Sequence, residues 1–147
     1  MVEKSASAKW NGALGDGSGT VSTDTGVLSN SPVSWGSRTN ESMEQTTPEE
    51  LIAAAHASCY AMAFAHYLDT NHTAPEALDV TASVGFGPNP EGGMKVTHSH
   101  LTVTGSVPGM DAATFADAAQ KAEAGCPVSN ALRGSIEITV EASLTGS

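Results

Sequence analysis

The sequence predicts an α+β fold, in which strands come first and last and helices lie between them. Strands are indicated at both ends by short β-like runs separated by Gly, Asp, Ser and Asn. Helices are indicated by one alanine-rich stretch, Pro48 to Leu68, and by a second, capped stretch that begins near residue 112. We find no internal repeat or linker in the 147 residues, which predicts one domain, 1–147, with a real hydrophobic core.

Composition narrows the classes of partner and the compartment. The net charge of -10, with only six Lys plus Arg, argues against nucleic acid and against anionic membranes. The N-terminal segment MVEKSASAKW has no apolar region of the kind that a secretory signal needs. Two cysteines without an export signal predict a cytoplasmic protein, where a disulfide is typically catalytic rather than structural.

The first 45 residues predict strands followed by a loop. Three short runs, Ala8 to Trp10, Gly19 to Ser22 and Gly26 to Leu28, predict a twisted antiparallel meander. Residues 30–45 show little periodicity and predict a long loop, and such loops tend to be functional or disordered. This loop carries Arg38, one of only two arginines in the chain.

The central stretch predicts a buried helix. Thr47 is a good N-cap, Pro48 suits the first helical position, and residues 51–68 include no Asp, Glu, Lys or Arg. A helix that is apolar on all sides is normally buried, so we expect Cys59 on a central core helix of a soluble protein, covered on several sides. One face carries Leu51, Ala55, Cys59, Met62 and His66, and the opposite face carries Ile52, Tyr60, Ala63 and Phe64.

The C-terminal half predicts strands around two helices. Asp111 caps the first of these helices, and Gly125 suits the position after its end. The alternation of Ile136, Ile138 and Val140 indicates a final strand with one buried face. The predicted elements are strands at Leu78–Phe86, Met94–Val107 and Ser135–Leu144, and helices at Ala112–Ala124 and Pro127–Leu132.

The two cysteines are the main chemical signal. The two cysteines could instead be buried structural thiols with no catalytic role, since free Cys is among the most buried residue types. Cys126 precedes Pro127 at a helix start, where backbone N–H groups and the helix dipole favour a thiolate. Cys59 lies mid-helix in apolar surroundings that raise its pKa, so it needs a cation before it can react first.

The histidines offer weaker alternatives. His98 and His100 share one face of a strand and could bind a metal, although a solvated polar face is the commoner explanation. His56 is three residues before Cys59 on the helix and could act as its base.

Four blocks of the sequence belong together: GTVSTDTGVL, TPEELIAAAHASC around Cys59, VPGMDAATF, and KAEAGCPVSNAL around Cys126. In this order they resemble the OsmC/Ohr family of thiol-dependent hydroperoxide reductases, and more closely its OsmC branch. The resemblance runs from about Trp10 to Leu144, nearly the whole chain. The blocks around the two cysteines, in this order, are specific.

The resemblance implies the OsmC-like fold, with antiparallel sheets and a central buried helix, in an intertwined homodimer. Cys59 matches the peroxidatic cysteine and Cys126 the resolving one. Arg38 matches the catalytic arginine, which supplies the missing cation, and Glu49 matches the glutamate that holds it. In the matched motif His56 belongs to the helix packing.

The implied activity is the reduction of organic hydroperoxides without a metal, flavin or haem. Cys59 attacks the peroxide and becomes a sulfenic acid, Cys126 condenses with it, and an external dithiol of lipoyl or thioredoxin type resets the pair. Two alternatives stay open at this point. One is a non-catalytic protein that binds a small apolar ligand in the same dimer cleft, and the other is a metal-binding protein that uses Cys59, His98 and His100.

Helix geometry and side-chain chemistry add two expectations. Ten residues on a continuous helix separate Glu49 from Cys59 by roughly 15 Å, so a second subunit should supply one side of a site that contains both. The substrate should be a bulky organic hydroperoxide rather than hydrogen peroxide, because apolar side chains surround Cys59 on its helix. These side chains are Ala55, Tyr60, Met62, Ala63 and Phe64.

Overall fold

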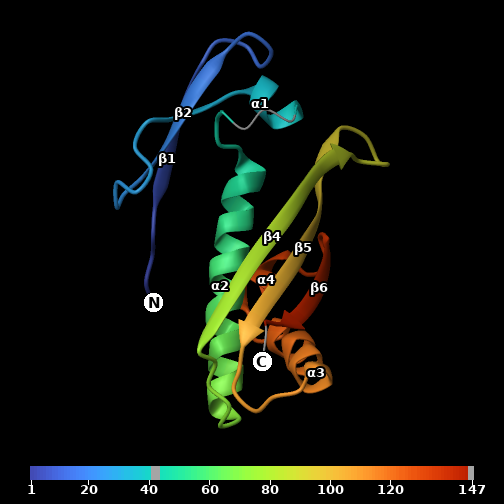
Figure 1. Ribbon diagram of the computed structural model, residues 1–147. Helices are drawn as coiled ribbons and strands as arrows, with labels where there is room; N and C mark the ends of the chain where they lie inside the picture. The colour runs from blue at the N-terminus through green and yellow to red at the C-terminus, as the bar shows by residue number, and fades with distance from the viewer. Residues whose placement is uncertain (41–43, 146–147) are drawn as a thin grey trace. The chain divides into compact units, whose positions relative to one another are not determined.

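The computed structural model describes residues 1–40 and 44–145 of the chain. The chain divides into two compact units, residues 1–51 and 52–147, while the expectation of one domain stays a prediction. The longest helix, α2 (Pro48–Thr70), begins in the first unit and continues through the second without a break (Figure 1). Thr47 caps it as predicted, since its Oγ1 accepts a hydrogen bond from the Glu50 backbone N–H at 3.1 Å.

The first unit contains an antiparallel meander of three strands, as predicted. The third strand, however, lies later in the chain than the predicted one. The strands are β1 (Ala6–Asn11), β2 (Ser18–Thr23) and β3 (Ser31–Val33), in the order β1-β2-β3. The strand predicted at Gly26 to Leu28 is wrong. The Gly26 N–H donates to the Thr23 carbonyl at 2.9 Å, and Gly26 has a φ of +79°, so this segment turns the chain after β2.

The predicted loop at 30–45 also contains regular structure. Its start forms β3, and residues Trp35–Thr39 form the short helix α1, which carries Arg38. Ser34 caps α1 because its Oγ accepts a hydrogen bond from the Ser37 N–H at 3.1 Å. Residues 41–43 of the predicted loop lie outside the described residues.

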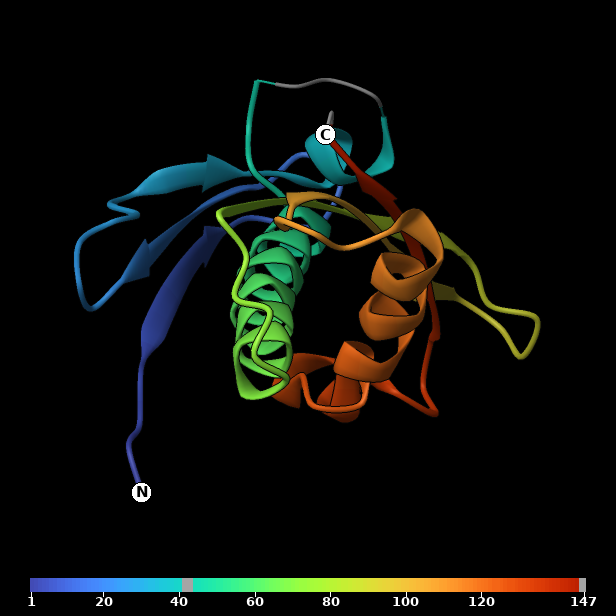
Figure 2. The ribbon, with the colours of Figure 1, turned by 60° about the horizontal axis from the view of Figure 1, so that its bottom comes forward.

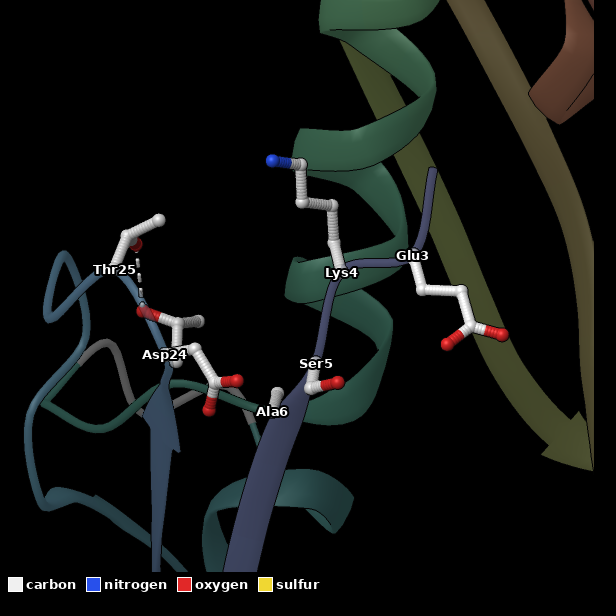
Figure 3. Close-up of a pocket in the computed structure, with 7 residues that line it drawn as sticks. Glu3, Lys4, Ser5, Ala6, Asp24 and Thr25 are labelled. Carbon is white, nitrogen blue, oxygen red and sulfur yellow. Dashed lines mark hydrogen bonds between the residues drawn. The ribbon is translucent and has the colours of Figure 1, made fainter. Parts of the chain in front are cut away.

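An open groove of about 550 Å³ lies between the segment before and at the start of β1 and the turn after β2 (Figure 3). Lys4 and Asp24 are among its lining residues, and Thr23 and Thr25 share a hydrogen bond of 3.2 Å beside it. The lining contains no cysteine or histidine, so this groove does not suggest thiol chemistry.

The second unit contains a mixed sheet of β4 (Ala77–Pro88), β5 (Met94–Ser106) and β6 (Glu137–Leu144). β4 pairs with β5 antiparallel as predicted, but β5 pairs with β6 parallel, so the expectation of purely antiparallel sheets needs correction. The connection from β5 to β6 contains α3 (Ala112–Glu123) and α4 (Pro127–Leu132). A connection with helices can return the chain in the same direction, whereas a tight hairpin cannot.

Helices α2 and α3 cover one face of this sheet (Figure 2). The Phe64 and Phe115 rings pack at the centre with centroids 5.2 Å apart. Gly105 on β5 leaves room for this packing, because a Cβ there would lie 2.7 Å from Phe115 Cζ. The largest apolar side chains of the core are Tyr60, Phe64, Leu68, Leu101, Val103 and Phe115.

Helix α2 is covered along one side within the single chain. The side that carries His56, Tyr60 and Phe64 is fully buried, while Ala55 is exposed and Met62 is 69% exposed. We expected α2 to be buried on several sides, but within the single chain only the side with His56, Tyr60 and Phe64 is fully buried. Among the described residues α2 is also the one helix long and apolar enough to cross a membrane, but its buried His56 and its packing on a sheet are typical of a core helix.

Candidate active site

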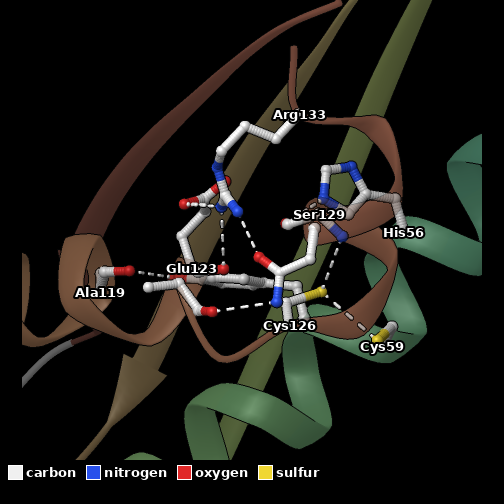
Figure 4. Close-up of polar contacts among 10 residues, drawn as sticks. His56, Cys59, Ala119, Glu123, Cys126, Ser129 and Arg133 are labelled. Carbon is white, nitrogen blue, oxygen red and sulfur yellow. Dashed lines mark hydrogen bonds and ion pairs between the residues drawn. The ribbon is translucent and has the colours of Figure 1, made fainter. Parts of the chain in front are cut away.

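The two cysteines meet in the second unit although 67 residues separate them in the sequence. Cys59 lies in the middle of α2, and Cys126 is the N-cap of α4. The Cys126 thiol donates a hydrogen bond to Cys59 Sγ at 3.3 Å, and both thiols are free (Figure 4). A disulfide needs a separation of about 2.05 Å, so closing the pair takes a movement of about 1.2 Å.

The surroundings of the two sulfurs differ. Cys126 is fully buried, and its Sγ accepts a hydrogen bond from the Ser129 N–H at 3.4 Å. Cys59 is partly exposed. Burial raises the pKa of the Cys59 thiol, a hydrogen bond from the Val128 N–H lowers it, and the neighbouring Cys126 raises it. The raised pKa agrees with the sequence argument, and Cys59 still needs a cation to ionise at neutral pH.

The predicted pair of Arg38 and Glu49 forms in the first unit. Arg38 Nη2 lies 2.8 Å from Glu49 Oε1, and Arg38 Nε donates to Oε1 at 3.0 Å and to Oε2 at 3.2 Å. The Glu49 side chain is only 8% exposed, whereas that of Arg38 is 31% exposed. Two donors of one guanidinium on one carboxylate fix the plane of the arginine.

A second polar group, which the sequence did not predict as a unit, is buried beside the cysteines. His56 on α2 is hydrogen-bonded through Nδ1 to Ser99 Oγ on β5 at 2.6 Å and through Nε2 to Ser129 Oγ on α4 at 2.7 Å. All three side chains are fully buried. Burial lowers the pKa of His56, and Glu123 raises it. The available signal was Ser99, a polar residue in alternation with Leu101 and Val103 on the buried face of β5.

This geometry argues against His56 as the base for Cys59, because hydroxyl groups occupy both ring nitrogens. The geometry also places the two histidines that were considered for a metal site, His98 and His100, away from Cys59. His98 and His100 alternate with Ser99, which faces α2, so they point away from the helix that carries Cys59. His100 instead contacts Thr139 at 2.5 Å and Glu141 at 3.5 Å. Residues 1–40 and 44–145 hold no group of three metal-ligating side chains.

Two residues expected near the substrate belong to the core instead. Tyr60 and Phe64 are fully buried, and the Tyr60 hydroxyl donates to the Ala119 carbonyl at 2.8 Å. Burial raises the pKa of Tyr60, so it stays a neutral phenol. The apolar residues that α2 leaves exposed near Cys59 are Ala55 and Met62.

Comparison with known proteins gives consistent matches along the chain. A family model described as OsmC-like protein matches residues 39–141. The chain is 41% identical over 137 residues to "Peroxiredoxin OsmC" of Escherichia coli (strain K12), covering 93% of this chain and 94% of that protein. It is 36% identical over 96 residues to "Organic hydroperoxide resistance protein" of Xanthomonas axonopodis pv. citri (strain 306), covering 65% of each. A crystal structure of an organic hydroperoxide resistance protein from Elizabethkingia anophelis matches with a TM-score of 0.76 at 28% identity, covering 98% of this chain and 99% of that one.

Proposed function

The chain belongs to the OsmC-like protein family, and from this premise we propose that it is a thiol-dependent peroxidase that reduces organic hydroperoxides to alcohols. Relatives named peroxiredoxin and organic hydroperoxide resistance protein support an enzyme of the peroxidase type with a hydroperoxide-related redox role. The observation that carries the finer proposal is the separation of 3.3 Å between Cys59 Sγ and Cys126 Sγ.

In the first step the Cys59 thiolate attacks the distal oxygen of the hydroperoxide. The O–O bond breaks, the alkoxide takes a proton and leaves as the alcohol, and Cys59 becomes a sulfenic acid. Cys59 is the attacking sulfur in this proposal because it is partly exposed, whereas Cys126 is fully buried.

In the second step Cys126 attacks the sulfur of the sulfenic acid. The new S–S bond forms, the S–O bond breaks, and the hydroxide leaves as water with the proton of the Cys126 thiol. An external dithiol, of lipoyl or thioredoxin type, then reduces the disulfide and is itself oxidised. This cycle fits the cytoplasm, where dithiol systems keep thiols reduced.

Arg38 supplies the positive charge that Cys59 lacks, and Glu49 holds its plane. We place the two residues at the Cys59 of a second subunit in a homodimer. Two observations support this arrangement. Helix α2 is unbroken from Pro48 to Thr70, so the rise of roughly 15 Å from Glu49 to Cys59 applies. The same helix leaves Ala55 and Met62 exposed in the single chain, and a partner would cover them.

The test is a count of free thiols before and after one equivalent of cumene hydroperoxide, with mass spectrometry of the product. We expect the loss of two thiols and a Cys59–Cys126 disulfide in the wild type. Cys59→Ser should consume no peroxide, while Cys126→Ser should turn over once and then accumulate Cys59 sulfinic acid under excess peroxide. Unchanged thiols in the wild type would instead favour a protein that only binds the ligand.

A further inference from the structure

His56 is the buried titratable group that the proposed cycle does not use. Its ring lies between three elements, α2, β5 and α4, and both ring nitrogens are hydrogen-bonded. A neutral imidazole has one N–H donor and one acceptor, so one serine hydroxyl accepts from the ring and the other donates to it. A satisfied polar group inside a core fixes one arrangement of its neighbours more strictly than apolar packing does.

Two of the contacts between α2 and the start of α4 form a ladder of two rungs, beside the hydrogen bond from the Val128 N–H to Cys59. His56 and Cys59 are three residues apart on α2, and Ser129 and Cys126 are three residues apart at the start of α4. One rung joins His56 Nε2 to Ser129 Oγ at 2.7 Å, and the other joins Cys59 Sγ to Cys126 Sγ at 3.3 Å. Both rungs join α2 to the start of α4, so the first rung holds Ser129 at a fixed place three residues from Cys126. Figure 4 shows His56 and Ser129 beside the two cysteines.

Further contacts stiffen this ladder. The Ser129 N–H donates to Cys126 Sγ at 3.4 Å, so Ser129 is linked to both rungs. The bond from His56 Nδ1 to Ser99 Oγ at 2.6 Å ties the ring to β5. The far end of α4 is held separately, by the Arg133–Glu123 ion pair at 2.5 Å. The start of α4, which carries Cys126, therefore contacts α2 through the two rungs and through the hydrogen bond from the Val128 N–H to Cys59, and the His56 rung is the one that involves no reacting sulfur.

We propose that His56 is a positioning residue for disulfide formation, which holds Ser129, and through it Cys126, opposite Cys59. This inference rests on the proposed two-cysteine cycle and adds a residue to its second step. The step itself is unchanged: Cys126 sulfur displaces the oxygen of Cys59 sulfenic acid, and water leaves. His56 takes no proton and contacts no substrate in this role.

The matched test compares Ser129→Ala with Ser99→Ala. Each removes one fully buried hydroxyl that is bonded to His56, so a merely structural role predicts similar losses of stability and similar rates. We expect Ser129→Ala to slow disulfide formation about tenfold, the factor that corresponds to about 1.4 kcal/mol. Ser99→Ala keeps the rung to α4 and should stay within about threefold of the wild type.

Two readouts separate the roles. In single turnovers with cumene hydroperoxide, trapping with dimedone gives the rate of sulfenic acid formation, which both variants should leave unchanged, and mass spectrometry gives the rate of disulfide formation. The equilibrium of the Cys59–Cys126 pair with dithiothreitol gives the intrinsic tendency to close without any peroxide. Equal rates and equal equilibria in the two variants would overturn the proposal.

If circular dichroism shows that a serine variant does not fold, His56→Gln and His56→Asn replace the pair. A glutamine amide reaches the place of Nε2 and keeps the rung to Ser129, whereas an asparagine amide reaches the place of Nδ1 and keeps only Ser99. Closure should be faster in His56→Gln, and equal or reversed rates would overturn the proposal. A wild type that consumes no hydroperoxide would contradict the proposed function alone, because the dithiothreitol equilibrium still decides the role of His56.

Discussion

Glu49→Gln tests whether the ion pair on Arg38 serves the first oxidation. The substitution keeps the shape of the side chain but replaces a charged carboxylate with one amide oxygen and an NH2 group that cannot accept. The two N–H groups that Arg38 directs at Glu49, at 2.8 to 3.2 Å, then have a single neutral acceptor. Glu50→Gln is the matched control, because Glu50 is the next residue in the same first helical turn and is exposed.

The magnitude follows from the burial of the pair. Removing one partner of a fully buried ion pair lowers stability by about 3–5 kcal/mol, whereas removing one partner of an exposed pair lowers it by about 0–1 kcal/mol. Glu49 is 8% exposed and Arg38 31% exposed, which places this pair between the two limits. We take a loss of about 2 kcal/mol, typical of a hydrogen bond to a charged group, which is about 30-fold in the population of correctly held Arg38.

The assay is the second-order rate of Cys59 oxidation by cumene hydroperoxide, with free thiols quenched by maleimide at short times. We expect Glu49→Gln to be about 30-fold slower than the wild type and Glu50→Gln to be within about twofold. Formation of the disulfide from the sulfenic acid should not change in either variant. If Glu49→Gln oxidises as fast as Glu50→Gln, the pair has no part in the first step.

Three further predictions concern the assembly, the substrate and pH. When inactive Cys59→Ser chains exchange subunits with inactive Arg38→Ala chains, each mixed dimer should gain one active site, because it joins an intact Cys59 to an intact Arg38. About half of the dimers are mixed after random exchange, so the average should reach about half a site per dimer. No recovery after confirmed subunit exchange would mean that one chain supplies both residues. Cumene hydroperoxide should oxidise Cys59 roughly a hundredfold faster than hydrogen peroxide, since three or four buried CH2 groups contribute about 0.8 kcal/mol each. Met62→Gln should reduce this ratio of the two oxidation rates. Equal rates with the two peroxides would exclude an apolar wall at the substrate site. Because burial lowers the pKa of His56, the unfolded state takes up the proton first as pH falls below about 6.5, so the free energy of unfolding measured in urea should decrease from pH 7.5 to pH 5.5. His56→Gln should make this decrease smaller, whereas His66→Gln, at an exposed position of the same helix, should leave it as in the wild type. Equal pH dependence in the two variants would contradict the assignment to His56.

Local features of the fold could be predicted because neighbouring residues determine them. Thr47 and Asp111 cap their helices through their own side chains, each to a backbone N–H three residues later. Cys126 was expected at a helix start and is the N-cap of α4. The segment around Arg38 was missed because β3 and α1 are short, and Ser34 as a cap was its main local signal.

The sequence alone determined the long helix through Cys59, the helix start at Cys126 and, through its motif blocks, the family. Only the tertiary structure decided which face of α2 is buried, since both faces are apolar and periodicity cannot rank them. The parallel direction of β6, the distance of 3.3 Å between sulfurs 67 residues apart and the serines that hold His56 were decided in the same way. Each depends on how α4 and the sheet pack against α2, and such long-range packing leaves no mark within a short window of sequence.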